Sequence, residues 1–184
     1  MKHEKYFHVY ENILSKYKDK KIKLVEIGVE NGGSLFIWQK FFPEAEIIGI
    51  DLNPKCKKFE KYGFNIEIGD QNLQEFWDGF FKKYKNVDVI IDDGGHTNSQ
   101  QINTVVSCIP HINDGGVLIT EDVMCSYFND FGNPNKYSFI NFSKKVVDDI
   151  NFKFPRIGNF KFSLNDYIHS IEFFESIVIF KINR

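Results

Sequence analysis

The sequence predicts an α/β fold in which a doubly wound, mostly parallel sheet of seven strands ends in an antiparallel hairpin. Short apolar runs alternate with amphipathic segments as far as Thr120, and this rhythm is typical of βαβ units whose sheet is covered on both faces. Nearer the C-terminus, two β-rich runs are joined only by Glu175-Ser176, which suits a hairpin. No proline- or glycine-rich linker divides the chain, so we expect one domain over residues 1–184.

Each element has its own local signal. The five parallel strands are expected where short apolar runs end in turn residues, at 23–27, 45–50, 64–68, 87–91 and 116–120. The helices between them follow an amphipathic pattern and are expected at 34–42, 74–84 and 98–109. The predicted hairpin strands are 167–174 and 177–182. An N-terminal amphipathic helix, 6–18, is expected within residues 1–20.

The composition argues against several classes of partner. The formal net charge is -2 and the pI is near 6.2, so the chain lacks the basic footprint of a nucleic-acid-binding protein. No apolar run reaches spanning length, and we expect neither membrane insertion nor a signal peptide. The three cysteines share no metal-like spacing and are expected to be reduced thiols, which indicates a cytoplasmic location.

A glycine-rich turn follows the first predicted strand. The pattern is Glu26-x-Gly28-x-x-x-Gly32, and Ser34 opens the next helix. Glycines let the backbone turn sharply and bring N–H groups against a ligand at the helix N-terminus. The spacing differs from the Gly-x-Gly-x-x-Gly of dinucleotide-binding folds, so it disfavours a pyrophosphate and favours a sulfonium ligand with an amino-acid tail. An ordinary structural turn explains this pattern equally well.

Acids end the second and third predicted strands. Asp51 lies at the end of strand two, where a carboxylate can take both hydroxyls of a ribose. Asp70 and Gln71 end strand three, where an acid and an amide can meet an adenine edge. The alternatives are a turn residue for Asp51 and a helix cap for Asp70. Together the three strand ends describe a pocket for adenosine with a non-phosphate tail, which is S-adenosylmethionine.

Carboxylates gather after the fourth and fifth predicted strands. Asp93 follows one strand and Glu121-Asp122 the other. If these strands are parallel neighbours, the three acids converge on a site that suits a hard cation, because unpaired carboxylates repel. His96 is then a candidate base beside the cation. The alternative is that Asp93 caps a helix and that Glu121-Asp122 is a solvated loop.

These motifs together resemble those of class I methyltransferases, and specifically the macrocin and mycinamicin sugar O-methyltransferase group, with cephalosporin hydroxylase-like relatives. The motifs that carry the resemblance are Glu26-x-Gly28, Ile50-Asp51, Gly69-Asp70-Gln71, Asp92-Asp93-Gly94-Gly95-His96, Gly115-Gly116, Glu121-Asp122-Val123, Ser126-Tyr127, Gly132-Asn133-Pro134 and residues 170–177. The resemblance implies a Rossmann-like sheet and two cofactors, S-adenosylmethionine and Mg²⁺ or a similar divalent cation.

The resemblance also implies roles for individual residues. Asp93, Glu121 and Asp122 would hold the cation, and His96 would be the general base, with Asp93 beside it in the catalytic group. The residues expected at the cofactor are Glu26, Gly28, Gly32, Ser34, Asp51, Leu52, Asp70, Gln71 and Asp92.

The expected reaction is transfer of a methyl group to a hydroxyl of a sugar or a related diol-bearing small molecule or glycan. Its acceptor pocket is expected to come from the N-terminal helix, from the 124–137 loop or from a neighbouring subunit of a homodimer. Tyr127 and Phe128 in that loop are candidates to contact a sugar ring. Two alternatives remain, a metal-dependent hydroxylase or hydrolase and a non-catalytic subunit that binds cofactor or glycan.

Overall fold

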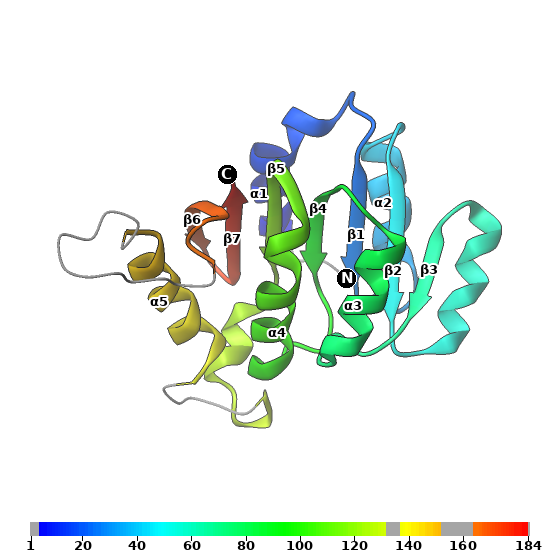
Figure 1. Cartoon of the computed structure of the whole chain (residues 1–184). Coiled ribbons are helices and arrows are strands. Elements are labelled where there is room, and N and C mark those ends of the chain that lie inside the picture. Colours follow the sequence, from blue (N-terminus) through cyan, green and yellow to red (C-terminus); the bar gives the residue numbers. More distant parts are fainter. Residues whose placement is uncertain (1–3, 132–136, 152–163, 184) are drawn as a thin grey trace.

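A seven-stranded sheet forms the centre of the computed structural model, which describes residues 4–131, 137–151 and 164–183 (Figure 1). The strands lie in the order β3-β2-β1-β4-β5-β7-β6. Their bounds are Lys23–Ile27 for β1, Glu46–Asp51 for β2, Asn65–Ile68 for β3, Val87–Asp92 for β4, Ile112–Thr120 for β5, Ile168–Phe174 for β6 and Ile177–Ile182 for β7. Neighbours among β1 to β5 are parallel, and β7 runs antiparallel to both β5 and β6. The predicted fold class and the C-terminal hairpin are confirmed.

Helices cover both faces of the sheet. The α-helices are α1, Glu4–Leu14; α2, Gly33–Phe41; α3, Gln74–Lys83; α4, Asn98–Cys108; and α5, Phe139–Asn151. The 3₁₀ segments are η1, Ser15–Tyr17; η2, Pro54–Tyr62; η3, Ile109–His111; η4, Val123–Tyr127; and η5, Asn129–Phe131. In Figure 1, α3 and α4 lie in front of the sheet while α1 and α2 lie behind it. The expected N-terminal helix is therefore present as α1 and η1.

Each face of the sheet has its own hydrophobic core. Side chains of a strand alternate between faces, so Val25 and Ile27 of β1 pack in the core that contains Trp77 of α3. Leu24 packs on the opposite face, with Trp38 of α2 and residues of α1. Since both cores are built on the same central strands, the ends of those strands are held rigidly.

Three elements differ from the sequence expectation. Strand β5 begins at Ile112 rather than at residue 116, because the polar stretch 113–115 is accommodated by a register irregularity opposite β4. Segment η2 was not predicted, since its apolar pattern is sparse; Pro54 starts it and the side chain of Asn53 accepts from Lys55 N. Helix α5 was also not predicted, although Phe139 and Val146 on it are buried.

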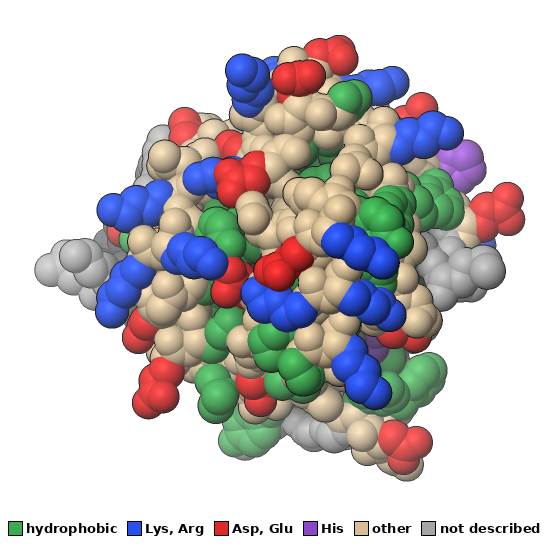
Figure 2. All heavy atoms as spheres, turned by 90° about the vertical axis from the view of Figure 1, so that its right-hand side faces the viewer, with side chains coloured by type: hydrophobic (Ala, Val, Ile, Leu, Met, Phe, Trp, Pro, Cys, Tyr) green, Lys and Arg blue, Asp and Glu red, His purple; other side chains and the backbone are tan. Residues whose placement is uncertain are grey.

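The surface beyond β3 has mixed charge. Figure 2 views the molecule from the side of β3 and η2, and it shows Lys and Arg side chains interspersed with Asp and Glu side chains. This mixture agrees with the small formal net charge of -2. Among the described residues, no helix has the length and apolar character needed to cross a membrane.

Candidate functional site

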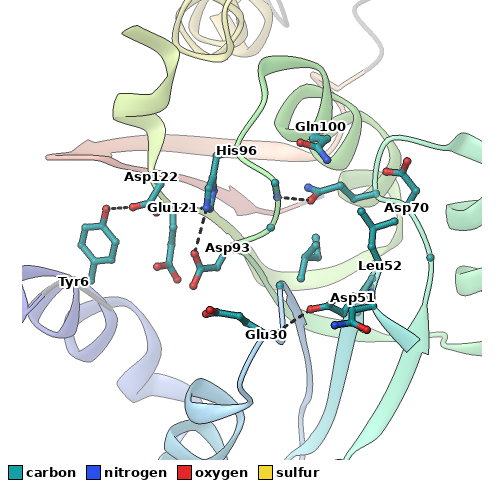
Figure 3. A pocket seen from close by; sticks show the side chains of 18 of the residues that line it. Tyr6, Glu30, Asp51, Leu52, Asp70, Asp93, His96, Gln100, Glu121 and Asp122 are labelled. Atoms are coloured by element: carbon teal, nitrogen blue, oxygen red, sulfur yellow. Dashed lines mark hydrogen bonds and ion pairs between the residues drawn. The ribbon is translucent and has the colours of Figure 1, made fainter. Parts of the chain in front are cut away.

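A cavity of about 640 Å³ opens at the carboxyl ends of the parallel strands (Figure 3). Its walls are formed by residues at or just after the ends of β1, β2, β3, β4 and β5, and by Tyr6 of α1. Strand β1 lies between β2 and β4, so the chain order reverses beside it. Ligands of open α/β sheets bind outside the strand ends at such a reversal. The topology thus places the cavity where a ligand site is expected.

The turn after β1 brings two loops into close approach. Gly28 has a φ of +92°, and its N–H donates to the carbonyl of Ile50 at 2.8 Å. A Cβ built on Gly28 would lie 2.0 Å from the carbonyl oxygen of Asp93. Only glycine fits here, because both the left-handed backbone and the neighbouring main chain exclude a side chain. Gly28 therefore joins the end of β1 to the loop that carries Asp93.

A left-handed backbone costs a residue other than glycine roughly 1–2 kcal/mol. Replacing Gly28 with Ala is expected to lower the free energy of unfolding by more than this, because the added Cβ would also overlap the main chain of Asp93. Thermal unfolding measures this effect. The matched control is Gly79→Ala, within α3, where an added Cβ meets no atom within 4 Å. That control should raise stability by about 0.5–1 kcal/mol. Equal melting temperatures for wild type and the Gly28 variant would contradict the packing argument.

The Asp51 carboxylate ties the first two strand ends together. Its Oδ2 accepts from the N–H groups of Val29 and Glu30 at 3.0 and 2.9 Å, and its Oδ1 accepts from Asn53 N at 2.8 Å. Asp51 and the neighbouring Leu52, which is 61% exposed, both line the cavity. Asp51 thus orders the glycine turn and also faces the ligand space.

The end of β3 contributes Asp70 and Gln71 to the wall. Asp70 Oδ1 accepts from Asn72 N at 2.8 Å, which forms a local turn rather than a cap of α3. Gln71 bridges two loops: its Nε2 donates to Asp92 Oδ1 at 2.9 Å and its Oε1 accepts from Gly95 N at 3.0 Å. Gln71 therefore fixes the glycine-rich loop that leads to His96.

Four residues expected to contact a cofactor directly do not line this cavity. They are Glu26, Gly32, Ser34 and Asp92. Glu26 is fully buried toward α2, where it accepts from Ser34 Oγ at 2.6 Å and from Trp38 Nε1 at 3.0 Å. The contact of these four residues with a cofactor stays a prediction. Alternation along β1 turns the Glu26 side chain toward α2 and into the core.

Asp92 and Gly32 also have internal roles. Asp92 is buried and accepts from Gln71 Nε2 and from Gly94 N. Burial raises the pKa of the Asp92 carboxyl above its ordinary value. Gly32 has a left-handed backbone before α2, and an added Cβ would overlap the Phe59 ring. Both residues support the cavity wall from behind.

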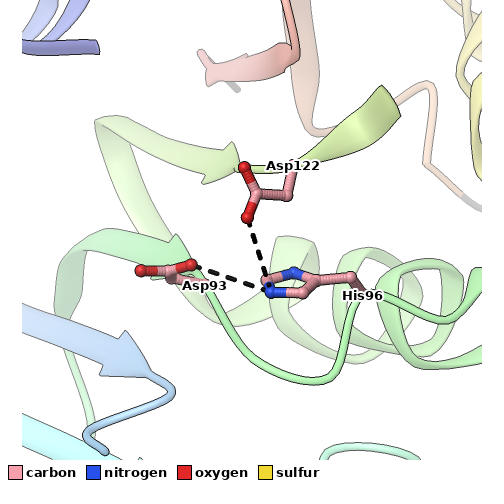
Figure 4. A group of neighbouring side chains, drawn as sticks. All are labelled: Asp93, His96 and Asp122. Carbon is pink, nitrogen blue, oxygen red and sulfur yellow. Dashed lines mark ion pairs between the residues drawn. The ribbon is translucent and has the colours of Figure 1, made fainter. Parts of the chain in front are cut away.

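On the other side of the cavity, Asp93, His96 and Asp122 form a compact group (Figure 4). One candidate ligand atom from each lies within 4.8 Å of the others. His96 Nε2 is 3.9 Å from Asp93 Oδ1 and 3.6 Å from Asp122 Oδ2. His96 Nδ1 is buried and has no hydrogen-bond partner within the described residues. The imidazole thus presents Nε2 to the carboxylates of Asp93 and Asp122. Carboxylate oxygens are the hard donors that Mg²⁺ prefers.

Glu121 is placed differently from the other two acids of the predicted metal set. It is 1% exposed and its carboxylate accepts a hydrogen bond from the Tyr10 hydroxyl. It lines the same cavity but is not part of the compact group, in which His96 joins Asp93 and Asp122. The alternative of a cap and a solvated loop is wrong, because Thr97 caps α4 and Glu121 is buried.

Three cavity residues other than glycine have left-handed backbones. The φ angles are +47° at Glu30, +57° at His96 and +53° at Asp122. Such a conformation costs about 1–3 kcal/mol and persists only where the surroundings determine it, and it is concentrated at functional sites. At His96 and Asp122 it turns the side chains toward each other.

Two tyrosines of α1 that were not predicted as site residues contact the acids. Tyr6 OH donates to Asp122 Oδ1 at 2.6 Å, and Tyr10 donates to Glu121. Burial, reinforced by the neighbouring carboxylates, raises the pKa of both phenols above the ordinary value. Their spacing of four predicts that they share one helix face, but no local signal shows that this face meets the acids.

Of the loop expected to contact an acceptor, the structure describes residues 124–131 and 137. Tyr127 and Phe128 are exposed and do not line the cavity, although Met124 does. The motif Gly132-Asn133-Pro134 lies outside the described residues.

Comparison with known proteins agrees with this geometry. Residues 25–123 match the model of a family described as a methyltransferase domain. The chain is 34% identical over 130 residues to mycinamicin VI 2''-O-methyltransferase of Micromonospora griseorubida, which covers 67% of this chain and 32% of that protein. It is 28% identical over 153 residues to demethylmacrocin O-methyltransferase of Streptomyces fradiae, which covers 77% of this chain and 38% of that protein.

A solved structure shares both fold and sequence similarity with the chain. The MycE methyltransferase from the mycinamycin biosynthetic pathway, in complex with Mg and SAH, superposes with a TM-score of 0.90 at 26% identity, over 96% of this chain and 48% of that one. The chain therefore spans about half of MycE and a smaller share of the two curated relatives. From the family match over residues 25–123 and the cavity at the strand ends, we conclude that this chain belongs to the methyltransferase domain family.

Proposed function

We propose that this chain is an S-adenosylmethionine-dependent and Mg²⁺-dependent O-methyltransferase that acts on a hydroxyl of a sugar or a related diol-bearing small molecule. The observation that carries the proposal is that one cavity has Asp51 on one side and Asp93, His96 and Asp122 on the other. The relatives named for O-methylation and the MycE complex with Mg and SAH support it. These similarities favour methyl transfer over a hydroxylase, a hydrolase or a non-catalytic subunit.

The cofactor would lie on the side of the cavity formed by β1, β2 and β3. Asp51 ends β2, where a carboxylate takes ribose hydroxyls, and Leu52 offers exposed apolar surface beside it. Gly28 lets the turn after β1 pack against the main chain of Asp93, while Asp70 and Gln71 form the far wall. For Glu26, Gly32, Ser34 and Asp92, a contact with the cofactor stays a prediction.

Replacing Asp51 with Ala is expected to weaken binding of S-adenosylhomocysteine by about 1–3 kcal/mol, through lost ribose contacts and a less ordered glycine turn. Isothermal titration calorimetry measures the affinity, and thermal unfolding checks the fold. Asp88→Ala is the matched control, because Asp88 also accepts a backbone N–H, from Lys23 at 2.8 Å, but does not line the cavity. Unchanged affinity in a folded Asp51 variant would remove this residue from the cofactor site.

The cation would be held by Asp93 and Asp122, with Glu121 beside them as a further carboxylate. The donor set fits Mg²⁺ because carboxylate oxygens are hard ligands and because Asp93, Glu121 and Asp122 line the same cavity. When bound, S-adenosylmethionine supplies a methyl group on a sulfonium, and Mg²⁺ supplies positive charge that lowers the pKa of a nearby hydroxyl.

His96 would accept the proton that the acceptor hydroxyl loses. Its Nε2 faces the cavity between the two carboxylates, and its Nδ1 is enclosed by protein. The left-handed backbone at His96 and the hydrogen bond from Gly95 N to Gln71 hold the imidazole in place. A neutral hydroxyl is a poor nucleophile until it is held in line with the methyl group and loses its proton. Asp93 and Asp122 would position it through the cation, and His96 would take the proton.

The acceptor would enter near Tyr6 and Met124, which line the cavity beside the acids. One solved MycE complex contains mycinamycin VI, and the curated relatives are named for methylation of sugar-bearing natural products. We therefore infer an acceptor with neighbouring hydroxyls, and not a nucleic acid.

Oligomeric state and location are separate parts of the proposal. A homodimer would be one way to complete the acceptor pocket. The free cysteines Cys56, Cys108 and Cys125 favour a cytoplasmic location.

The direct test is a methyl-transfer assay with S-adenosylmethionine and Mg²⁺ over a panel of free sugars, nucleotide-sugars and glycosylated natural products. Formation of S-adenosylhomocysteine together with a product heavier by one methylene is the expected outcome. A product gaining oxygen, or hydrolysis without methyl transfer, would favour the hydroxylase or hydrolase alternative. Cofactor binding without turnover across the panel would favour a non-catalytic subunit.

A further inference from the structure

Helix α1 directs two phenol groups onto the acids of the proposed cation site. Tyr6 OH donates to Asp122 Oδ1 at 2.6 Å, and Tyr10 OH donates to Glu121 Oε1. Figure 3 shows Tyr6 reaching from α1 to Asp122 across the edge of the cavity. These contacts join the first helix to the residues that follow β5, more than a hundred positions later in the chain. Two such contacts, one to each of the adjacent acids, indicate that α1 contributes to the site.

The Tyr6 phenol occupies one oxygen of Asp122, and the other oxygen faces the site. At Asp122, Oδ1 is bonded to Tyr6 while Oδ2 lies 3.6 Å from His96 Nε2, within the compact acid–imidazole group. A donor on one oxygen limits rotation of the whole carboxylate, because a planar group turns as a unit. The Tyr6 contact therefore sets the direction of the oxygen that faces His96.

Tyr10 is itself held firmly. Its ring packs edge-on against Trp38, with centroids 5.0 Å apart and an interplanar angle of 79°. The indole of Trp38 donates to Glu26 Oε1 at 3.0 Å, and all three side chains are buried. This connected set passes from β1 through α2 and α1 to Glu121. A donor fixed in this way holds its acceptor more closely than a mobile surface group would.

We propose that Tyr6 and Tyr10 are positioning residues that orient Asp122 and Glu121 for binding of a divalent cation. The proposal rests on the proposed function, because it assumes that these acids hold the cation. It makes α1 a structural part of the cation site and not merely a cover for the sheet. Partners that orient metal-binding carboxylates typically change metal affinity by about 10–100-fold when they are removed.

The test uses Tyr6→Phe and Tyr10→Phe, which remove one oxygen and keep the ring. Tyr17→Phe is the matched control: Tyr17 lies just after α1 and donates to the carbonyl of Gly115 at 2.6 Å, away from the cavity. Mg²⁺ affinity is measured by calorimetry and Mn²⁺ affinity by electron paramagnetic resonance, each with saturating S-adenosylhomocysteine. Affinity for S-adenosylhomocysteine and the melting temperature are measured separately.

The expected result is a loss of metal affinity of about 10–100-fold in either active-site variant and none in Tyr17→Phe, with affinity for S-adenosylhomocysteine kept within about twofold. Equal metal affinity in wild type and both variants would overturn this inference while leaving the proposed function in place. No metal binding by the wild type would overturn both. If Tyr10→Phe does not fold, Tyr6→Phe alone decides, since its hydroxyl lies at the cavity edge.

Discussion

Replacing His96 with Ala should lower the methyl-transfer rate by about 10²–10⁴-fold, which is the usual contribution of a positioned general base. His96 is the histidine that lines the cavity among the described residues, and its Nε2 lies within 4 Å of both Asp93 and Asp122. Without the imidazole, the acceptor hydroxyl would have to lose its proton to water. The cofactor is expected to bind as before, because its proposed contacts lie at the ends of β1, β2 and β3.

A second histidine provides the control for this experiment. His111 stacks on Phe81 with ring centroids 4.2 Å apart and lies outside the main cavity. His111→Ala should lower the melting temperature but leave the rate per folded molecule within a few-fold of wild type. Steady-state kinetics with S-adenosylhomocysteine detection measures both variants. If His96→Ala keeps a rate close to wild type, proton removal does not depend on this imidazole.

Exhaustive chelation of divalent cations should abolish turnover, and Mg²⁺ should restore it. Asp93, Asp122 and Glu121 gather around one cavity, and without a cation the cluster of negative charge would repel an acceptor oxygen as it loses its proton. Asp122→Asn should mimic chelation, because the substitution keeps the shape of the side chain but removes its charge. Activity is measured before chelation, after it and after Mg²⁺ is added back.

The control for the charge change is Asp130→Asn, an exposed acid of η5 that does not line the main cavity. It should remain fully active and should show the same dependence on Mg²⁺ as wild type. Full activity of the wild type after complete chelation would show that the acids serve the structure alone. Loss of activity that Mg²⁺ fails to restore would point instead to damage by the chelator or to another metal.

The sequence by itself determined the architecture and the location of the site. Alternation of apolar and amphipathic segments predicted the parallel strands, and the two-residue connection at Glu175-Ser176 predicted the hairpin between β6 and β7. Asp51 ends a strand, and Asp93 and Asp122 come just after strands; parallel topology brings the carboxyl ends of β1 to β5 to one edge. Such features are local or follow from a general rule of topology, so they can be predicted without coordinates.

Only the tertiary structure decided which side chains face the cavity. Glu26 and Gly28 are two residues apart, yet Glu26 is turned into the core and Gly28 lines the cavity. His96 and Asp122 meet where both have left-handed backbones, a conformation that their residue types permit but do not specify. The partnership of Tyr6 with Asp122 spans 116 positions and depends on how α1 packs against the sheet. Local patterns encode periodicity, whereas side-chain direction and long-range contact are set by the packing of the whole fold.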